Sequence, residues 1–198
     1  MEEVRRRRYY DTHFRRDALK LLPGEYVVTD TDILLVTVLG SCVAACLRDR
    51  QSGIGGMNHF MLPGGEGGES SQLDRGARYG VHAMELLIND LLKQGARREN
   101  LEAKVFGGGN VLRSFAVTDV GHSNAVFVRK FLEREKIPLL AADLEDKFPR
   151  KVYFFPKSGR VMVKRLRDMH NYTIVSRESA YSKRIAEVAP GGEVELFS

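Results

Sequence analysis

The sequence has little cysteine, no tryptophan and no long hydrophobic run. Two of its 198 residues are cysteine, none is tryptophan and six are proline. So few cysteines exclude a disulfide-dense scaffold, and we expect both thiols to be free. The lack of an apolar run of roughly eighteen residues excludes an ordinary membrane-spanning helix. The arginines near the N-terminus are not followed by the apolar core of a signal peptide. We therefore expect a cytoplasmic protein that does not insert into a membrane.

The composition is otherwise that of an ordinary soluble domain. Hydrophobic residues make up 43% of the chain and charged residues 29%, and a chain of this length can bury a sizeable core. The net charge is +5, and the first twenty residues hold seven basic and four acidic side chains. Such a stretch can bind nucleic acid, anionic lipid or an acidic protein, or it is simply solvated. No nucleic-acid-binding module follows it, so we expect no nucleic-acid partner.

The chain divides into three parts on its hydrophobic pattern. We expect a basic N-terminal arm at residues 1–24, which ends in a Pro-Gly turn, one domain at residues 25–168, and a C-terminal extension at residues 169–198. The Gly- and Ser-rich stretch at residues 63–76 predicts a surface loop.

Strands outnumber helices in this pattern. Apolar residues at helical spacing predict helices at residues 79–94 and 123–135, and a shorter one at 179–188. Runs of apolar and β-branched residues predict strands at 25–29, 33–39, 43–47, 54–62, 101–106, 137–142, 151–155 and 160–164. Because the strands cluster at both ends of the chain, the predicted fold class is α+β rather than an alternating α/β sheet.

One predicted hairpin brings a cysteine and a histidine together. Its arms are the runs at residues 43–47 and 54–59, joined by a polar turn at residues 49–52. This register sets Cys42 directly opposite His59, with Cβ atoms roughly 4.5–5.5 Å apart. An imidazole at that distance can accept the thiol proton, and we expect the resulting thiolate to act as a nucleophile. The alternative is a packed thiol beside a core histidine, and the pattern alone leaves both open.

Small residues surround this pair. Gly40 and Ser41 precede the thiol, and their backbone N–H groups can approach a substrate carbonyl oxygen, as an oxyanion site requires. Asn110 follows the glycines of the sequence FGGGN, which predict a tight turn, and we expect this side chain to line the cleft. The turn lacks the spacing of a phosphate-binding loop.

A metal site is the weaker interpretation of the same residues. Zinc would need Cys42, Cys46, His59 and a fourth ligand such as His82. His82 belongs to the predicted central helix and Cys46 has no imidazole opposite, so Cys46 is predicted to be a small core residue. We expect no metal and no organic cofactor.

Five segments resemble a known family. The sequence LGSCVAACLRD followed by GIGGMNHFMLP, and the later KVFGGGNVL, resemble the CheD family, the chemoreceptor glutamine deamidases of bacterial chemotaxis. The helix at residues 78–96 and the stretch at 121–164 resemble the same family. The resemblance implies that residues 25–168 are a CheD-like deamidase domain. It also implies a layered α-β-β sandwich similar to the catalytic domains of bacterial deamidating toxins.

The resemblance also implies a reaction. Cys42 matches the nucleophile and His59 the general base for hydrolysis of glutamine side-chain amides on methyl-accepting chemotaxis receptors. The products are glutamate and ammonia, and the intermediate is a glutamyl thioester. The family's third residue is a threonine six positions before the cysteine, where this chain has Val36, so the neighbouring Thr37 is carried as the third member. The alternative function that the resemblance leaves open is a regulatory module acting with the phosphatase CheC.

Overall fold

The computed structural model describes residues 7–63, 69–110, 120–166 and 172–187. The described strands are β1 (Arg8–Asp11), β2 (Arg16–Lys20), β3 (Tyr26–Thr29), β4 (Leu34–Leu39), β5 (Val43–Asp49), β6 (Gly55–Asn58), β7 (Leu101–Gly107), β8 (Leu139–Leu144), β9 (Arg150–Phe155) and β10 (Arg160–Arg165). The described helices are α2 (Glu69–Lys93), α3 (Val120–Arg134), α4 (Tyr172–Glu187) and the short 3-10 helix η1 (Arg98–Asn100). None of these helices is both long enough and apolar enough to cross a membrane.

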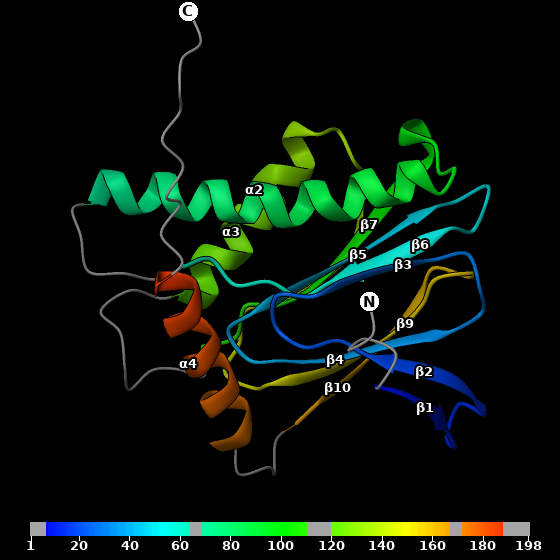
Figure 1. The fold of residues 1–198 in the computed structure, drawn as a ribbon, viewed down its shortest axis with the longest axis horizontal. Helices are drawn as coiled ribbons and strands as arrows, with labels where there is room; N and C mark the ends of the chain where they lie inside the picture. Colours follow the sequence, from blue (N-terminus) through cyan, green and yellow to red (C-terminus); the bar gives the residue numbers. More distant parts are fainter. Residues whose placement is uncertain (1–6, 64–68, 111–119, 167–171, 188–198) are drawn as a thin grey trace, which may run out of the picture.

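The strands form two five-stranded sheets (Figure 1). The first sheet has the strand order β1-β2-β4-β9-β10 and the second has the order β3-β6-β5-β7-β8. Neighbouring strands are antiparallel except for two pairs, β2 with β4 and β7 with β8, which are parallel. Helices α2 and α3 lie over the second sheet, whereas α4 lies at one end of the sheets (Figure 1).

Two hydrophobic cores fix the order of these layers. The core between the helices and the second sheet includes Leu47, Phe60, Leu87 and Phe131. The core between the two sheets includes Leu35, Met57, Phe106 and Phe154. The layers are therefore helices, second sheet and first sheet, and the predicted α+β class is confirmed.

The N-terminal residues belong to the first sheet. Strand β2 pairs with β4, with Ala18 beside Leu34, and β1 pairs with β2. Ala18 and Leu19 are buried in the core. The expectation of a solvated basic arm at residues 1–24 is therefore wrong for residues 8–20. A charged edge strand is readily mistaken for a tail, because it carries exposed charged side chains. Arg8 of the edge strand β1 forms an ion pair at 2.7 Å with Asp17 of the neighbouring strand β2.

Two helices are longer than their sequence pattern predicts. Helix α2 begins at Glu69, inside the stretch that was predicted to be a loop. Helix α4 begins at Tyr172, seven residues before the predicted helix at 179–188. It supplies Tyr181 and Ile185 to the core between the sheets. The described part of the C-terminal extension is thus packed onto the domain.

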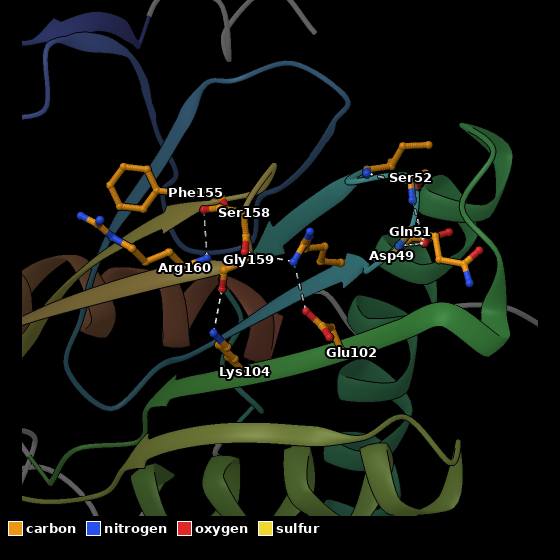
Figure 2. A network of polar contacts seen from close by, with 11 residues as sticks. Asp49, Gln51, Ser52, Glu102, Lys104, Phe155, Ser158, Gly159 and Arg160 are labelled. Atoms are coloured by element: carbon orange, nitrogen blue, oxygen red, sulfur yellow. Dashed lines mark hydrogen bonds and ion pairs between the residues drawn. The ribbon is translucent and has the colours of Figure 1, made fainter.

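A polar network holds the sheets together at the turn end of the β5–β6 hairpin (Figure 2). Lys104 of β7 donates a hydrogen bond to the carbonyl oxygen of Gly159, between β9 and β10, at 2.8 Å. Arg48 of β5 donates to the carbonyl oxygen of Ser158 at 3.0 Å. These contacts join the second sheet to the first sheet at the end of β5 that is farther from Cys42.

Candidate active site

The β5–β6 hairpin has a different register from the predicted one. Leu47 pairs with Gly56, and Val43 forms an isolated bridge with Phe60. The turn is displaced by one position, because Gly53 adopts a positive φ of 73° and belongs to the turn. The predicted register is therefore wrong by two residues.

A shift of two residues keeps each side chain on its face of the sheet. Cys42 and His59 consequently remain on one face, although they are diagonal neighbours rather than directly opposed. Three atoms that can act as ligands, one each from Cys42, His59 and Glu178, lie within 4.8 Å of one another. The structure thus brings the cysteine and histidine together and adds a carboxylate from α4.

Thr37 contacts the imidazole from strand β4. Its Oγ1 donates a hydrogen bond to the carbonyl oxygen of Leu21 at 3.0 Å, since a carbonyl can only accept. The same oxygen lies 2.7 Å from Nδ1 of His59 and must accept its proton. Val36, at the position where the family's threonine was expected, is buried in a different cluster, with Leu34.

The contact with Thr37 fixes the tautomer of His59. With the proton on Nδ1, the other ring nitrogen, Nε2, carries a lone pair. Nε2 is buried and has no hydrogen-bond partner among the described residues. A buried unpaired acceptor is unusual in a folded protein, and here it leaves a base available beside the thiol of Cys42.

Three consecutive backbone N–H groups converge on one point beside the thiol. Gly40 and Ser41 donate to the Glu178 carboxylate at 2.7 Å each, and Cys42 donates at 3.2 Å. The hydroxyl of Ser41 donates to the same carboxylate at 2.7 Å. Such a cluster of donors can stabilise negative charge on oxygen. The role of Gly40 and Ser41 in a substrate oxyanion site stays a prediction.

The glycine-rich turn after β7 holds this backbone in place. Gly108 donates to the carbonyl oxygen of Cys42 at 2.8 Å and Gly109 to that of Gly40 at 2.7 Å. Gly107 has a φ of 109°, and a Cβ there would lie 2.1 Å from the carbonyl oxygen of Cys42. Only glycine fits at this position. The carbonyl groups of Gly40 and Cys42 are thus held by the turn, while their N–H groups donate to Glu178.

Asn124 of α3 supports the same segment from the helix layer. Its amide donates to the carbonyl oxygen of Ser41 at 2.8 Å, and its own carbonyl accepts from the N–H of Leu62 at 2.8 Å. Asn110 lies at the end of the glycine-rich turn, where its N–H donates to the carbonyl oxygen of Asp146 at 2.7 Å. A place for Asn110 in the substrate cleft stays a prediction.

Glu178 is the site residue that no sequence motif indicated. It is 1% exposed, Cys42 is 0% exposed and His59 is 2% exposed, so the site is closed. The only signal in the sequence is the spacing of the buried residues of α4, Ile174, Glu178, Tyr181 and Ile185, which places one acidic residue within an apolar helical stripe.

Burial makes both reactive groups neutral in this closed arrangement. It lowers the pKa of His59 to about 3. Burial, together with the adjacent carboxylate of Glu178, raises the pKa of the Cys42 thiol well above its ordinary value. The expectation of a readily formed thiolate is therefore wrong while Glu178 occupies the site, because a second negative charge beside the carboxylate is unfavourable.

The cysteine, the histidine and the carboxylate are also residue types that bind metals. Cys46 and His82, which the zinc alternative required, do not belong to this group among the described residues. Both oxygens of Glu178 already accept two hydrogen bonds each. The donors around the carboxylate favour an anionic oxygen at this point rather than a cation.

The low pKa of His59 makes stability depend on pH. The unfolded chain binds a proton on this imidazole below about pH 6.5, whereas the folded chain does so only near pH 3. The unfolded state therefore binds more protons between these values, and stability falls as the pH drops through this window. We expect a loss of about 2 kcal/mol by about pH 5, measured by urea unfolding.

The matched variant for this measurement is His59→Asn, which cannot titrate. Its free energy of unfolding should change about 2 kcal/mol less than that of the native protein between neutral pH and about pH 5. His82→Asn, at an exposed position of α2, should follow the native protein. Parallel curves for the native protein and His59→Asn would contradict the assignment of a neutral buried imidazole.

Comparison with known proteins places the chain in a family. Residues 61–165, just over half of the chain, match the family model for CheD, described as CheD chemotactic sensory transduction. This match begins two residues after His59. The chain is also similar over nearly its whole length to curated proteins that include residues before that point.

Two of these relatives carry the name probable chemoreceptor glutamine deamidase CheD. The protein from Janthinobacterium sp. (strain Marseille) is 61% identical over 96% of this chain and 94% of its own length. The protein from Thiobacillus denitrificans is 59% identical over 99% of this chain and 97% of its own length.

A solved structure gives a more distant likeness. A Neisseria meningitidis protein of family DUF152 has a TM-score of 0.41 and 13% identity, over 70% of this chain and 62% of that chain. The family match and the near full-length relatives establish the relationship, and the chain belongs to the CheD family.

Proposed function

We propose that this protein hydrolyses the side-chain amides of selected glutamines on methyl-accepting chemotaxis receptors, giving glutamate and ammonia. The names of its curated relatives support a chemoreceptor substrate. The observation that carries the proposal is the unpaired Nε2 of His59 in the same small group as the Cys42 thiol. The proposal also includes a fold similar to the catalytic domains of bacterial deamidating toxins and a cytoplasmic location for the protein.

The first step forms the covalent bond to the substrate. Nε2 of His59 accepts the thiol proton as Sγ of Cys42 attacks the carbon of the glutamine carboxamide. The carbonyl oxygen becomes an oxyanion, which the N–H groups of Gly40, Ser41 and Cys42 stabilise in place of the Glu178 carboxylate. This step requires Glu178 to leave the site, because the substrate oxygen needs the same donors.

The second step breaks the carbon–nitrogen bond. The protonated His59 gives its proton to the leaving nitrogen, ammonia departs, and a glutamyl thioester remains on Cys42. The same imidazole then takes a proton from water, whose oxygen attacks the thioester carbon. Cleavage of the carbon–sulfur bond releases glutamate, and the thiol regains its proton. The chemistry requires no metal and no organic cofactor. A partnership with the phosphatase CheC stays a prediction.

The test of this proposal is conversion of receptor glutamines. The protein is incubated with the cytoplasmic fragment of a methyl-accepting receptor, and ammonia is assayed while peptide mapping locates each glutamine converted to glutamate. We expect ammonia and converted glutamines in equal amounts. Binding to the receptor without conversion, by both the native protein and Glu178→Ala, would contradict a deamidase and favour a binding module.

Thr37 is proposed to act as a positioning residue for His59. Thr37→Val keeps the shape of the side chain but removes the hydroxyl that accepts from Nδ1. We expect kcat to fall roughly 10–100-fold, because the imidazole loses its tautomer and orientation, with little change in KM. Thr37→Ser keeps the hydroxyl and should recover most of kcat. A native kcat in Thr37→Val would show that Thr37 does not position His59.

A further inference from the structure

Helix α4 places the Glu178 side chain on the backbone donors of the proposed site. The reaction under "Proposed function" releases a glutamate side chain, and the side chain found on the N–H groups of Gly40, Ser41 and Cys42 is itself a glutamate. We propose that α4 is an intramolecular product mimic, which must leave before substrate enters, and that the surface beneath it binds a glutamine-bearing substrate helix. This inference rests on the proposed function.

Hydrogen bonding supports this assignment. The two oxygens of Glu178 accept four hydrogen bonds, three from backbone N–H groups and one from the Ser41 hydroxyl. Bonds to a charged acceptor are about twice as strong as neutral ones. These donors come from residues 40–42, which are more than 130 positions away in sequence. The Glu178 carboxylate is therefore buried at a point where four donors are arranged around an anionic group.

The rest of α4 supplies an apolar stripe that covers the site. Ile174 lies four residues before Glu178, and Tyr181 and Ile185 lie three and seven residues after it. Tyr181 hydrogen-bonds to Tyr79 of α2. It also packs against Gly24, where a Cβ would lie 2.9 Å from the tyrosine ring. A substrate helix with apolar residues at these spacings from its glutamine fits the same surface.

One pair of like charges makes α4 an imperfect occupant. Arg177, the residue before Glu178, lines the same cavity as Lys20, so two cations lie near each other when α4 is docked. Burial lowers the pKa of Lys20, and repulsion from the nearby Arg177 lowers it further. A substrate helix with an acidic residue just before its glutamine replaces this repulsion with attraction. The docked α4 is therefore displaceable by a substrate that matches the surface better.

The first test measures access to the thiol, which does not depend on any activity. In the full-length chain, Glu178→Ala should raise the alkylation rate of Cys42 by more than about tenfold, since each charge-assisted bond lost shifts the docking equilibrium by about that factor. Ile185→Ala keeps Glu178 but weakens packing of the stripe, and it should also raise the rate. Arg177→Glu should lower the rate below the native value.

Two references accompany this measurement. Cys46, buried in the core, should alkylate slowly and equally in every variant, and any variant in which it reacts fast is partly unfolded. Ser176→Ala, at an exposed position of α4, should behave as native. Because Glu178→Ala also removes the carboxylate that raises the pKa of the Cys42 thiol, the variants that keep Glu178 decide the test. Equal Cys42 rates in the native protein, Ile185→Ala and Arg177→Glu would overturn the proposal.

The second test asks whether Glu178 occupies the place of the reacting group. In Glu178→Gln the new amide lies where a substrate amide is proposed to react, so the protein should convert it to glutamate and release ammonia. Peptide mass analysis detects the conversion, and Cys42→Ala in the same chain should abolish it. The exposed Gln51 and Gln94 serve as internal references that remain amides.

The outcomes separate this inference from the proposed function. A receptor that is deamidated while Glu178→Gln keeps its own amide would overturn the product mimic and leave the deamidase intact. A receptor that is never deamidated, by the native protein or by Glu178→Ala, would overturn the deamidase, and the alkylation rates would still report whether α4 covers Cys42.

Discussion

Replacing Cys42 with alanine is expected to abolish deamidation, with a fall in kcat/KM of at least about ten-thousandfold. Without the thiol there is no covalent intermediate, and water must attack an unactivated amide. The variant should fold, because alanine is smaller than cysteine and the N–H groups of residues 40–42 are unchanged. Ammonia release from a receptor fragment, with the free energy of unfolding measured in parallel, checks both expectations.

The matched control is Cys46→Ala. Cys46 is buried to the same degree, but it lies within β5 and packs in the core between the sheets. We expect this variant to lose a little stability, as a small cavity costs about 1 kcal/mol, and to keep its activity. Activity that survives Cys42→Ala but not Cys46→Ala would reverse the assignment of the nucleophile.

His59→Asn is expected to lower kcat about 100–10,000-fold, the range typical of a lost general acid–base group. The asparagine amide places an N–H donor near the position of Nδ1, so the contact with Thr37 can persist. It removes Nε2, which is the atom proposed to accept the thiol proton. Initial rates at saturating receptor measure kcat, and the pH dependence of the alkylation rate of Cys42 measures how readily the thiol ionises.

The pH–rate profile makes this prediction more specific. The pH–rate profile of His59→Asn should lack one limb of the native profile, because one titrating group has been removed. His82→Asn should leave both kcat and the profile unchanged, since this histidine is exposed on α2. A His59→Asn enzyme with native kcat would show that another group accepts the thiol proton.

The local part of the site could be predicted from the sequence. The hairpin and its alternation place Cys42 and His59 on one face, and the small residues before the thiol indicate a backbone anion site. The register was wrong by two residues because Gly53 belongs to the turn, and a glycine at a turn does not reveal its φ. Cys42 and His59 still share one face of the sheet, because a shift of two residues keeps each side chain on its original face.

The parts contributed by distant segments could not be predicted. Glu178 comes from the C-terminal part of the chain, and a single acidic residue within an apolar helical stripe does not indicate which distant groups it contacts. Strands β1 and β2 were missed because most of their residues are charged or exposed, and only two adjacent residues of β2, Ala18 and Leu19, are buried in the core. Thr37 was considered as the third member of the site, and its contact with Nδ1 of His59 indicates how it could act; its role stays a prediction.

The most direct test of the account is detection of the glutamyl thioester. Receptor fragment is mixed with excess native enzyme and with excess Glu178→Ala, the mixtures are quenched in acid during the first turnover, and the peptides are mapped by mass spectrometry. The account predicts a transient adduct on the peptide that contains Cys42, at higher occupancy in Glu178→Ala. Complete conversion of receptor glutamine with an adduct on another residue, or with none on Cys42 at any time, would contradict it.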